Sequence, residues 1–194
     1  YKLERSVNDL KGELSAVQLL SPKLKSALQE SILNRRETVL VYRSETRAEL
    51  NELQNWVNNG GSLLAFSEHA PFDQAINPLL RKFDIESSIG TTVDTINYES
   101  KYGPGMIKFE NKNLNTSHPI VNGKYKVEKL VSFGGSALLG SKYENILKLD
   151  ESSFNVKHST GIGPEGKGNS QGLAGVYGSG KIAAFGDSNG FTAM

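Results

Sequence analysis

The side chains with the most chemical potential follow three short apolar runs of the sequence. Arg43-Ser44-Glu45 comes after the first run, Ser67-Glu68-His69 after the second and Asp187-Ser188-Asn189 after the third. If these runs are parallel strands, their carboxyl ends meet at one edge of a sheet, where ligands bind in open α/β folds. We therefore expect one site there, with these candidate catalytic residues: His69, Glu68 and Asp187. The candidate ligand-binding residues are Arg43, Ser67, His69, Asp187 and Ser188. The alternative is that these polar residues only cap helices and satisfy turn backbone.

Ser67 occupies the strand-to-helix turn where a nucleophile elbow would place its serine. That elbow needs small residues, usually glycine, two positions to either side, and the chain has Ala65 and His69 there. His69 is too close in sequence to be the base for Ser67, which leaves His118 or His158 for that role. The pattern argues against a serine nucleophile, and the lack of cysteine excludes a cysteine nucleophile.

A metal site is another alternative for the same residues. Imidazole and carboxylate ligands suit zinc, manganese or iron. The ligands would be His69, Glu68, Asp73, Asp187 and His118. No HExxH or comparable spacing joins them, so we expect no metal and no cofactor.

The stretch Gly161–Lys167 has the glycine pattern of the start of a phosphate loop. Gly168 stands where serine or threonine would hold magnesium, and Pro164 removes an amide donor. We expect a surface loop there.

Composition narrows the functional classes. The chain of 194 residues is long enough for one domain with a sizeable core. Its 22 Lys+Arg and 21 Asp+Glu give a net charge of +1, so no overall field draws it to nucleic acid or an anionic membrane. No apolar run approaches the roughly 20 residues needed to span a bilayer. We therefore expect one soluble domain over residues 1–194, with no nucleic-acid partner and no membrane span.

Alternating strand and helix patterns must position the candidate site. The runs Thr38 to Tyr42 and Ser62 to Phe66 are typical of strands covered on both faces. A helical stripe lies between them and ends at Gly60-Gly61; its apolar positions are Leu50, Leu53 and Val57. A helix from Pro71 to Phe83 should be kinked or restarted at Pro78 behind an Asn77 cap.

Two amphipathic helices are also predicted ahead of the first strand. The first, over residues 1–14, has one apolar stripe: Leu3, Val7, Leu10 and Leu14. The second opens at Ser21-Pro22, with a serine N-cap and proline at the first helical position. Its apolar face carries Leu24, Leu28 and Ile32.

The second half of the chain has a different texture. After about Ile85 short strands alternate with Gly, Asn, Ser and Thr; they are expected over 91–98, 106–109, 125–133 and 145–149. Residues 173–177 and 181–185 predict a hairpin across Gly178-Ser179-Gly180. We expect this half to be an antiparallel or mixed extension of the same sheet. The βαβα alternation of the first half predicts an α/β fold with a parallel sheet between helices.

The chain also resembles a known family. The run from Trp56 to Phe66 is similar to the helix, double glycine and strand of the class I glutamine amidotransferase-like fold. Further motifs resemble an uncharacterised, mostly bacterial branch with an Asp/Glu-His-x-Pro-Phe motif: residues 67–73 (SEHAPFD), 118–120 (HPI), 133–136 (FGGS), 180–187 (GKIAAFGD) and 191–193 (FTA).

This resemblance implies a flavodoxin-like three-layer sandwich with a mainly parallel sheet and an antiparallel C-terminal extension, without an agreed activity. It also implies a strand ahead of this sequence and a periplasmic or secreted location. Glutamine hydrolysis is not expected, because Ser67 replaces the family's cysteine and the flanking glycine is missing.

Two functional hypotheses follow. The first is a non-catalytic domain that binds a small polar ligand (a sugar or peptide) or a protein partner at the carboxyl ends of the parallel strands. The second is a hydrolase with His69 as general base and Glu68 or Asp187 orienting the imidazole or helping to hold a metal. A purely structural role, in which a sheet edge pairs with another chain, is a third alternative.

Overall fold

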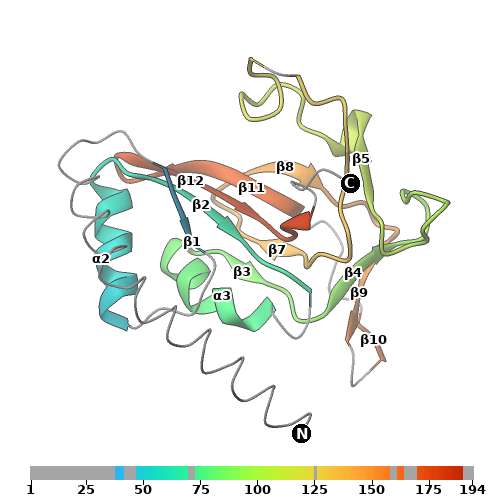
Figure 1. Ribbon diagram of the computed structural model, residues 1–194, viewed down its shortest axis with the longest axis horizontal. Coiled ribbons are helices and arrows are strands. Elements are labelled where there is room, and N and C mark those ends of the chain that lie inside the picture. Colours follow the sequence, from blue (N-terminus) through green and yellow to red (C-terminus); the bar gives the residue numbers. More distant parts are fainter. Residues whose placement is uncertain are drawn as a thin grey trace, which may run out of the picture.

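The computed structural model describes residues 38–41, 47–69, 73–124, 126–157, 161–163 and 170–189 (Figure 1). A mixed sheet forms its centre. The strand order is β1 (Thr38–Val41), β2 (Ser62–Phe66), β12 (Gly180–Phe185), β11 (Ser170–Tyr177), β7 (Leu138–Leu139) and β3 (Glu86–Ser87), and β8 (Glu144–Lys148) also pairs with β11. Strands β1, β2 and β12 are parallel to one another. Strand β11 is antiparallel to β12, β7 and β8.

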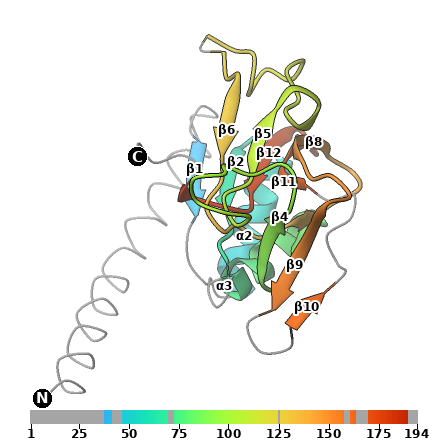
Figure 2. The same cartoon turned by 90° about the vertical axis from the view of Figure 1, so that its right-hand side faces the viewer.

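Two smaller sheets lie beside the main one (Figure 2). The first contains β10 (Gly161–Gly163), β9 (Ser153–Lys157) and β4 (Thr91–Asp94), all antiparallel. The second pairs β5 (Lys108–Glu110) with β6 (Lys129–Val131). After Ile85, the described residues extend the main sheet through β3, β7, β8, β11 and β12, and their other strands form the two smaller sheets.

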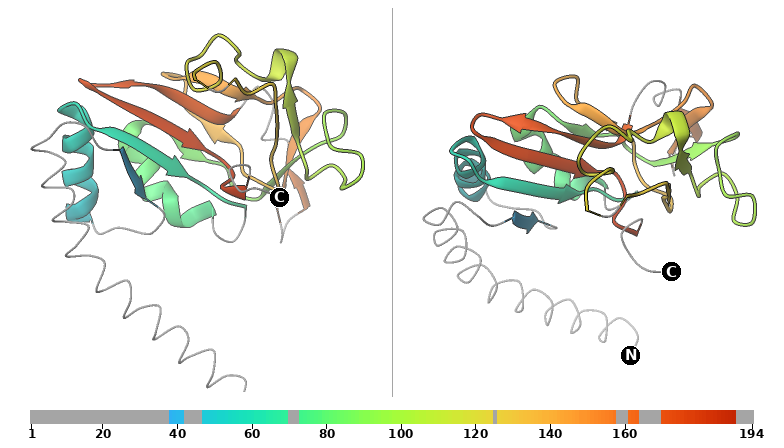
Figure 3. Two further views of the ribbon diagram at one scale, coloured as in Figure 1. Left: turned by 45° about the horizontal axis from the view of Figure 1, so that its top comes forward. Right: turned by 90° about the horizontal axis from the view of Figure 1, so that it is seen from above.

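Two α-helices lie on one face of the main sheet (Figure 3). They are α2 (Arg47–Asn58) and α3 (Asp73–Leu80), and α3 continues into the 3-10 turn η1 (Arg81–Phe83). Pro78 lies inside α3 without restarting it, so the predicted restart at Asn77 is wrong. A second 3-10 turn, η2 (Asn111–Asn113), lies in the loops near β5.

Alternating side chains of β2 and β12 feed two hydrophobic cores on opposite faces of the sheet. Leu63 and Ala65 pack with the helices, together with Ile182 and Ala184 of β12. Phe66 and Phe185 pack on the other face against side chains from β5, β8 and the loop that follows η2. This two-sided burial explains why both strands are short continuous apolar runs.

A buried carboxylate joins β4 to β9. Asp94 is 1% exposed, and its Oδ1 accepts hydrogen bonds from the backbone N–H groups of Ile96 and Asn97, both at 2.8 Å. Its Oδ2 accepts one from the hydroxyl of Ser153 in β9 at 2.9 Å. Burial opposes ionisation, but these backbone bonds and the side-chain bonds from Ser152 and Asn97 outweigh it and lower the pKa of Asp94.

Several local predictions are confirmed. Strand β2 has the predicted bounds, β1 and α2 lie where the apolar patterns placed them, and β11 and β12 form the predicted hairpin. The predicted helices over residues 1–14 and from Ser21 lie outside the described residues.

The expected three-layer α/β sandwich is wrong. Strands dominate the described residues, the mixed sheet curls into a half-barrel, and the two described α-helices lie on the same face. The reason is that the βαβ pattern holds only for β1, α2 and β2. Beyond Ile85 the chain supplies antiparallel strands, and loops and small strands cover part of the second face. No helix among the described residues has the length and apolarity needed to cross a membrane.

Candidate functional site

Four chain segments converge where β2 and β12 end, and we call the surface they form the strand-end rim. They are residues 67–69 after β2, 88–90 after β3, 133–136 before β7 and 186–189 after β12. The parallel pairing of β2 with β12 sets Phe66 beside Phe185, so the segments that follow these strands emerge together. The stacked rings of Phe66 and Phe185, 6.0 Å apart, lie directly before the rim in sequence.

Glu68 is buried and holds the segment after β12. Its Oε1 accepts hydrogen bonds from the backbone N–H of Ser188 at 3.1 Å and from the Ser188 hydroxyl. Its Oε2 lies 3.4 Å from Nδ1 of His69. One carboxylate oxygen is thus used to fix a loop, and the other faces the imidazole.

Asp187 is also buried, and it holds two more pieces of backbone. Its Oδ2 accepts a hydrogen bond from the backbone N–H of Phe133 at 2.6 Å, and its Oδ1 accepts one from that of Asn189 at 2.9 Å. A carboxylate that accepts two backbone N–H donors stabilises the loops that carry them. Asp187 therefore positions the 133–136 segment against the end of β12.

Ser67 faces the interior rather than the rim surface. It is 2% exposed, and its hydroxyl shares a 2.7 Å hydrogen bond with the hydroxyl of Ser87 in β3. Asn77 of α3 holds Ser87 in turn, since its side chain accepts from the backbone N–H of Ser87 and donates to the Ser87 carbonyl. This buried network uses Ser67 as a structural link between β2, β3 and α3.

Ser136 and Gly186 bring the segments into close contact. The Ser136 hydroxyl lies within hydrogen-bond distance of two carbonyl oxygens, those of Glu68 at 2.6 Å and Gly90 at 2.9 Å. The backbone N–H of Ser136 donates to the Gly186 carbonyl. A Cβ on Gly186 would lie 1.8 Å from the Ser136 carbonyl oxygen, so only glycine permits this approach.

The exposed part of the rim is more apolar than the sequence suggested. The His69 side chain is 34% exposed, Phe133 is 48% exposed and Ile89 is 49% exposed. The backbone N–H of Phe133 donates to Asp187, which fixes the backbone at Phe133. Ile89 directly precedes Gly90, and the Ser136 hydroxyl lies within hydrogen-bond distance of the carbonyl oxygens of both Gly90 and Glu68. The segments of the rim thus carry a partly exposed imidazole and two half-exposed apolar side chains, and their carboxylates are buried.

The remaining candidate residues lie elsewhere or outside the described residues. Arg43 and His158 belong to the undescribed part of the chain, as does the Asp73 side chain. His118 lies in a turn, where its Nδ1 accepts a hydrogen bond from the backbone N–H of Ile120. Among the described residues no group of three histidine, aspartate or glutamate side chains is placed to hold a metal ion. Of the predicted phosphate-like loop, Gly161–Gly163 forms β10 and the rest is not described.

The structure thus brings Glu68, His69, Asp187 and Ser188 together, and it adds residues that sequence reasoning missed. Ser136, Phe133 and Ile89 come from segments far from β2 and β12 in the chain. The pair Gly134-Gly135 was the available signal: Gly134 has a φ of 68°, and a Cβ on Gly135 would lie 2.6 Å from Cβ of Asp187. A double glycine that follows an aromatic residue therefore marks the close approach of two loops.

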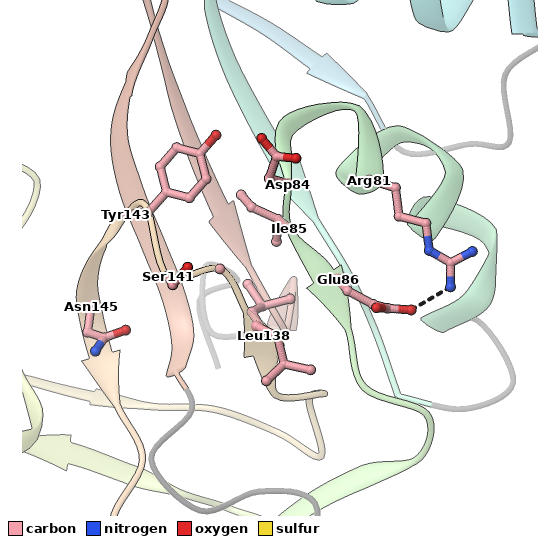
Figure 4. Close-up of a pocket in the computed structure, with 10 residues that line it drawn as sticks. Arg81, Asp84, Ile85, Glu86, Leu138, Ser141, Tyr143 and Asn145 are labelled. Carbon is pink, nitrogen blue, oxygen red and sulfur yellow. Dashed lines mark hydrogen bonds and ion pairs between the residues drawn. The ribbon is translucent and has the colours of Figure 1, made fainter.

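A separate cavity of about 740 Å³ lies between η1, β3 and the turn from β7 to β8 (Figure 4). An ion pair between Arg81 and Glu86 borders it, with nitrogen and oxygen 2.5 Å apart. Tyr143 also lines it and donates a 2.5 Å hydrogen bond to the Phe83 carbonyl, and burial raises the pKa of Tyr143 to about 12. Its charged groups are exposed and form surface ion pairs, Arg81 with Glu86 and Asp84 with Lys142 outside the cavity, so the cavity presents no chemistry comparable to that of the rim.

No family model matches the chain, and no curated protein matches it. Among solved structures, the fold is similar to "mmIFT52 N-terminal domain", with a TM-score of 0.56 and 16% identity over 88% of this chain and 78% of that one.

Two other structures are less similar. Exo-beta-1,4-mannosidase Op5Man5 from Opitutaceae bacterium strain TAV5 has a TM-score of 0.38 and 14% identity, over 81% of this chain and 22% of that one. Cytoplasmic Protein STM3548 from Salmonella typhimurium has a TM-score of 0.43 and 18% identity, over 81% and 62%. With TM-scores below 0.5, these two likenesses do not establish a shared fold.

These comparisons correct the expected family. The fold is β-rich and similar to that of the mmIFT52 N-terminal domain, not an amidotransferase-like sandwich. The bacterial origin and the export that the resemblance implied lose their support with it.

Proposed function

We propose that the domain is a non-catalytic binding module that takes a peptide segment of a partner protein on the strand-end rim. The observation that carries this proposal is the use of Glu68 and Asp187. Both are buried, and together they accept backbone N–H groups from three residues of the rim loops: Phe133, Ser188 and Asn189. A general acid or base must instead reach the substrate proton that it transfers.

The exposed side chains favour a peptide as the ligand. Phe133 and Ile89 are each about half exposed, on segments that the carboxylates and Ser136 hold in place. Exposed apolar side chains on a fixed backbone are suited to bury the apolar side chains of a partner, and aromatic residues often supply most of the binding energy. His69, whose side chain is about one third exposed, adds a polar group on the same rim.

One distance favours a second candidate, the hydrolase. His69 Nδ1 lies 3.4 Å from Glu68 Oε2, an arrangement that would orient the imidazole and leave Nε2 to act as a base. The distance is longer than the roughly 2.6–3.2 Å of a hydrogen bond in a working acid–base pair, although such bonds shorten when substrate binds. The experiment below therefore includes a test for hydrolysis.

The test is a peptide-display selection on the full chain, followed by anisotropy measurements with the selected peptides. We expect Phe133→Ser and Ile89→Ser to weaken binding by about tenfold each, because each removes buried apolar contact. The control is Val176→Ser, an equally apolar exposed residue on β11 at the opposite end of the sheet.

If the selected peptides bind the unchanged protein, the Phe133→Ser and Ile89→Ser variants and the Val176→Ser control with equal affinity, the rim is not the binding site. Hydrolysis of an ester or amide panel that is lost in His69→Ala would replace the proposal with the hydrolase. Binding only to members of a sugar panel would show that the ligand class is wrong.

A further inference from the structure

A second cavity, of about 730 Å³, lies on the face of the main sheet that is turned away from α2 and α3. It is an open groove, because Val176 and Ile120, which both line it, are 70% and 44% exposed. Strands β2, β12 and β11 form its floor, and the turn at residues 117–120 forms one wall. None of the rim segments lines it, so the groove is separate from the strand-end rim. Its volume lies within the roughly 300–1,000 Å³ that is typical of small-molecule sites.

The groove floor is polar at one end and apolar at the other. Ser62 of β2 and Lys181 of β12 are neighbours in register at the polar end. Two positions further along the strands, Leu64 lies beside Ala183, and both are only partly buried. Phe185 of β12 follows at the apolar end and is 3% exposed. Alternate residues of a strand share a face, so these side chains form one continuous surface.

Two charged side chains give the groove an electrostatic direction. Lys181 is exposed and forms no ion pair within the part of the chain that the structure describes. The Ser62 hydroxyl beside it supplies a second hydrogen-bond donor. Glu144 lines the groove from β8, next to Ala174 of β11. An anionic group is therefore attracted to the Lys181 end of the groove and repelled from the Glu144 side.

We propose that this groove binds a single medium-chain carboxylic acid. Its carboxylate accepts hydrogen bonds from Lys181 and Ser62, and its hydrocarbon chain lies along the floor toward Phe185. Phe185 follows Lys181 by four positions, roughly 13 Å at about 3.3 Å per residue, which a saturated chain of about ten carbons spans. Burial of that chain supplies the affinity, and the charged end fixes the orientation, as in other small-molecule sites. This site is independent of the peptide surface at the rim.

Titration calorimetry of the full chain with sodium decanoate, kept below its micelle concentration, tests the proposal. We expect saturable binding of one decanoate per chain. In a series from hexanoate to decanoate, each added methylene should tighten binding by roughly twofold to threefold, since an open groove buries only part of each one. Chains longer than about ten carbons should gain little more, because they extend beyond the floor.

Reversal of the charge at Lys181 tests the orientation of the ligand. The unchanged protein should bind decanoate roughly tenfold more tightly than decylammonium, and Lys181→Glu should reverse this preference. The matched control is Lys148→Glu, because Lys148 is also exposed on the main sheet but does not line the groove. This control should keep the preference for decanoate.

A second variant blocks the groove floor. Ala183→Phe places a large side chain where the hydrocarbon chain lies, and it should weaken decanoate binding by roughly tenfold because the buried methylene contacts are lost. The control Ala75→Phe adds the same side chain at an exposed position of α3 and should leave binding unchanged. Trp56, the single tryptophan, is buried on the helix-covered face, so unchanged tryptophan fluorescence shows that each variant remains folded.

Saturable binding that follows chain length, reverses its charge preference in Lys181→Glu and weakens in Ala183→Phe would support the site. Decanoate binding that is absent, does not saturate or is equal in all variants would overturn it. An unchanged preference in Lys181→Glu would also overturn it, even if Ala183→Phe weakened binding, because the groove would then hold an apolar ligand without a carboxylate contact at Lys181.

Discussion

Asp187 offers the sharpest test of the claim that the rim carboxylates are structural. The change Asp187→Asn preserves shape but replaces one carboxylate oxygen with an NH₂ group. One of the two backbone donors, the N–H of Phe133 or of Asn189, then faces another donor inside the protein. A surface-facing catalytic aspartate would tolerate the same change with little loss of stability.

The size of the effect follows from the two bonds. A hydrogen bond to a charged acceptor contributes about 1.5–3 kcal/mol, and a buried donor without an acceptor costs about 1–3 kcal/mol. Since Asp187 is 4% exposed, solvent cannot replace the lost bond, and we expect a loss of about 3 kcal/mol. That is a large part of the roughly 5–15 kcal/mol by which domains are stable.

Urea unfolding followed by Trp56 fluorescence measures this loss, because Trp56 is buried in the helix-covered core. With a typical slope of about 2 kcal/mol per M, the midpoint should fall by about 1.5 M. The matched control is Asp84→Asn: Asp84 forms an exposed ion pair with Lys142, and its φ of 58° suits asparagine. If both variants unfold at the midpoint of the unchanged protein, Asp187 does not hold the rim, and the case against a catalytic role fails.

Three further predictions concern other parts of the fold. The pKa of Asp94 is lower in the folded chain than its usual 3.8, so the unfolded chain binds more protons in acid. The free energy of unfolding should therefore fall as the pH drops through the folded pKa. In urea titrations at a series of pH values, Asp94→Asn should flatten this pH dependence. Gly186→Ala should cost about 3 kcal/mol or more in thermal unfolding, because its Cβ would meet a backbone carbonyl; Gly105→Ala, with nothing within 4 Å, should cost little. Tyr143→Phe should lose about 1–2 kcal/mol of unfolding free energy at neutral pH. Because burial raises the pKa of Tyr143 from 10.0 to about 12, that difference should shrink only as the pH rises through this range.

The local structure was predictable where one stretch of chain determines it. Strand β2 is a continuous apolar run because both of its faces are buried, and Gly60-Gly61 ends α2 directly before it. The β11–β12 hairpin has its turn at Gly178, whose φ of 58° suits glycine. In these places residue type and backbone conformation agree without help from distant segments.

The overall fold was not predictable in this way, because distant pairings decide it. Strands β7 and β3 have two residues each and pair with each other in the main sheet. Two residues are too few to show an alternation of apolar and polar side chains in the sequence. The pattern of β1, α2 and β2 is shared by sandwiches with helices on both faces and by this half-barrel. What distinguishes the two is the antiparallel half of the sheet, whose register depends on Gly172 and on shifts between Ser170 and Leu173.

The site shows the same division between local and distant information. Glu68, His69 and Asp187 lie near one another, as their positions after parallel strands predicted, but no pattern in the sequence indicated which of these groups face solvent. Adjacent residues diverge, and here the carboxylates turn inward to backbone donors from residues 133 and 188–189. A polar residue after a buried strand can either contact a substrate or accept hydrogen bonds from the backbone of nearby loops. The choice depends on whether a distant segment brings N–H groups that need an acceptor. At this rim such segments are present, and the carboxylates that first suggested catalysis hold the backbone of Phe133, Ser188 and Asn189 at the proposed binding surface.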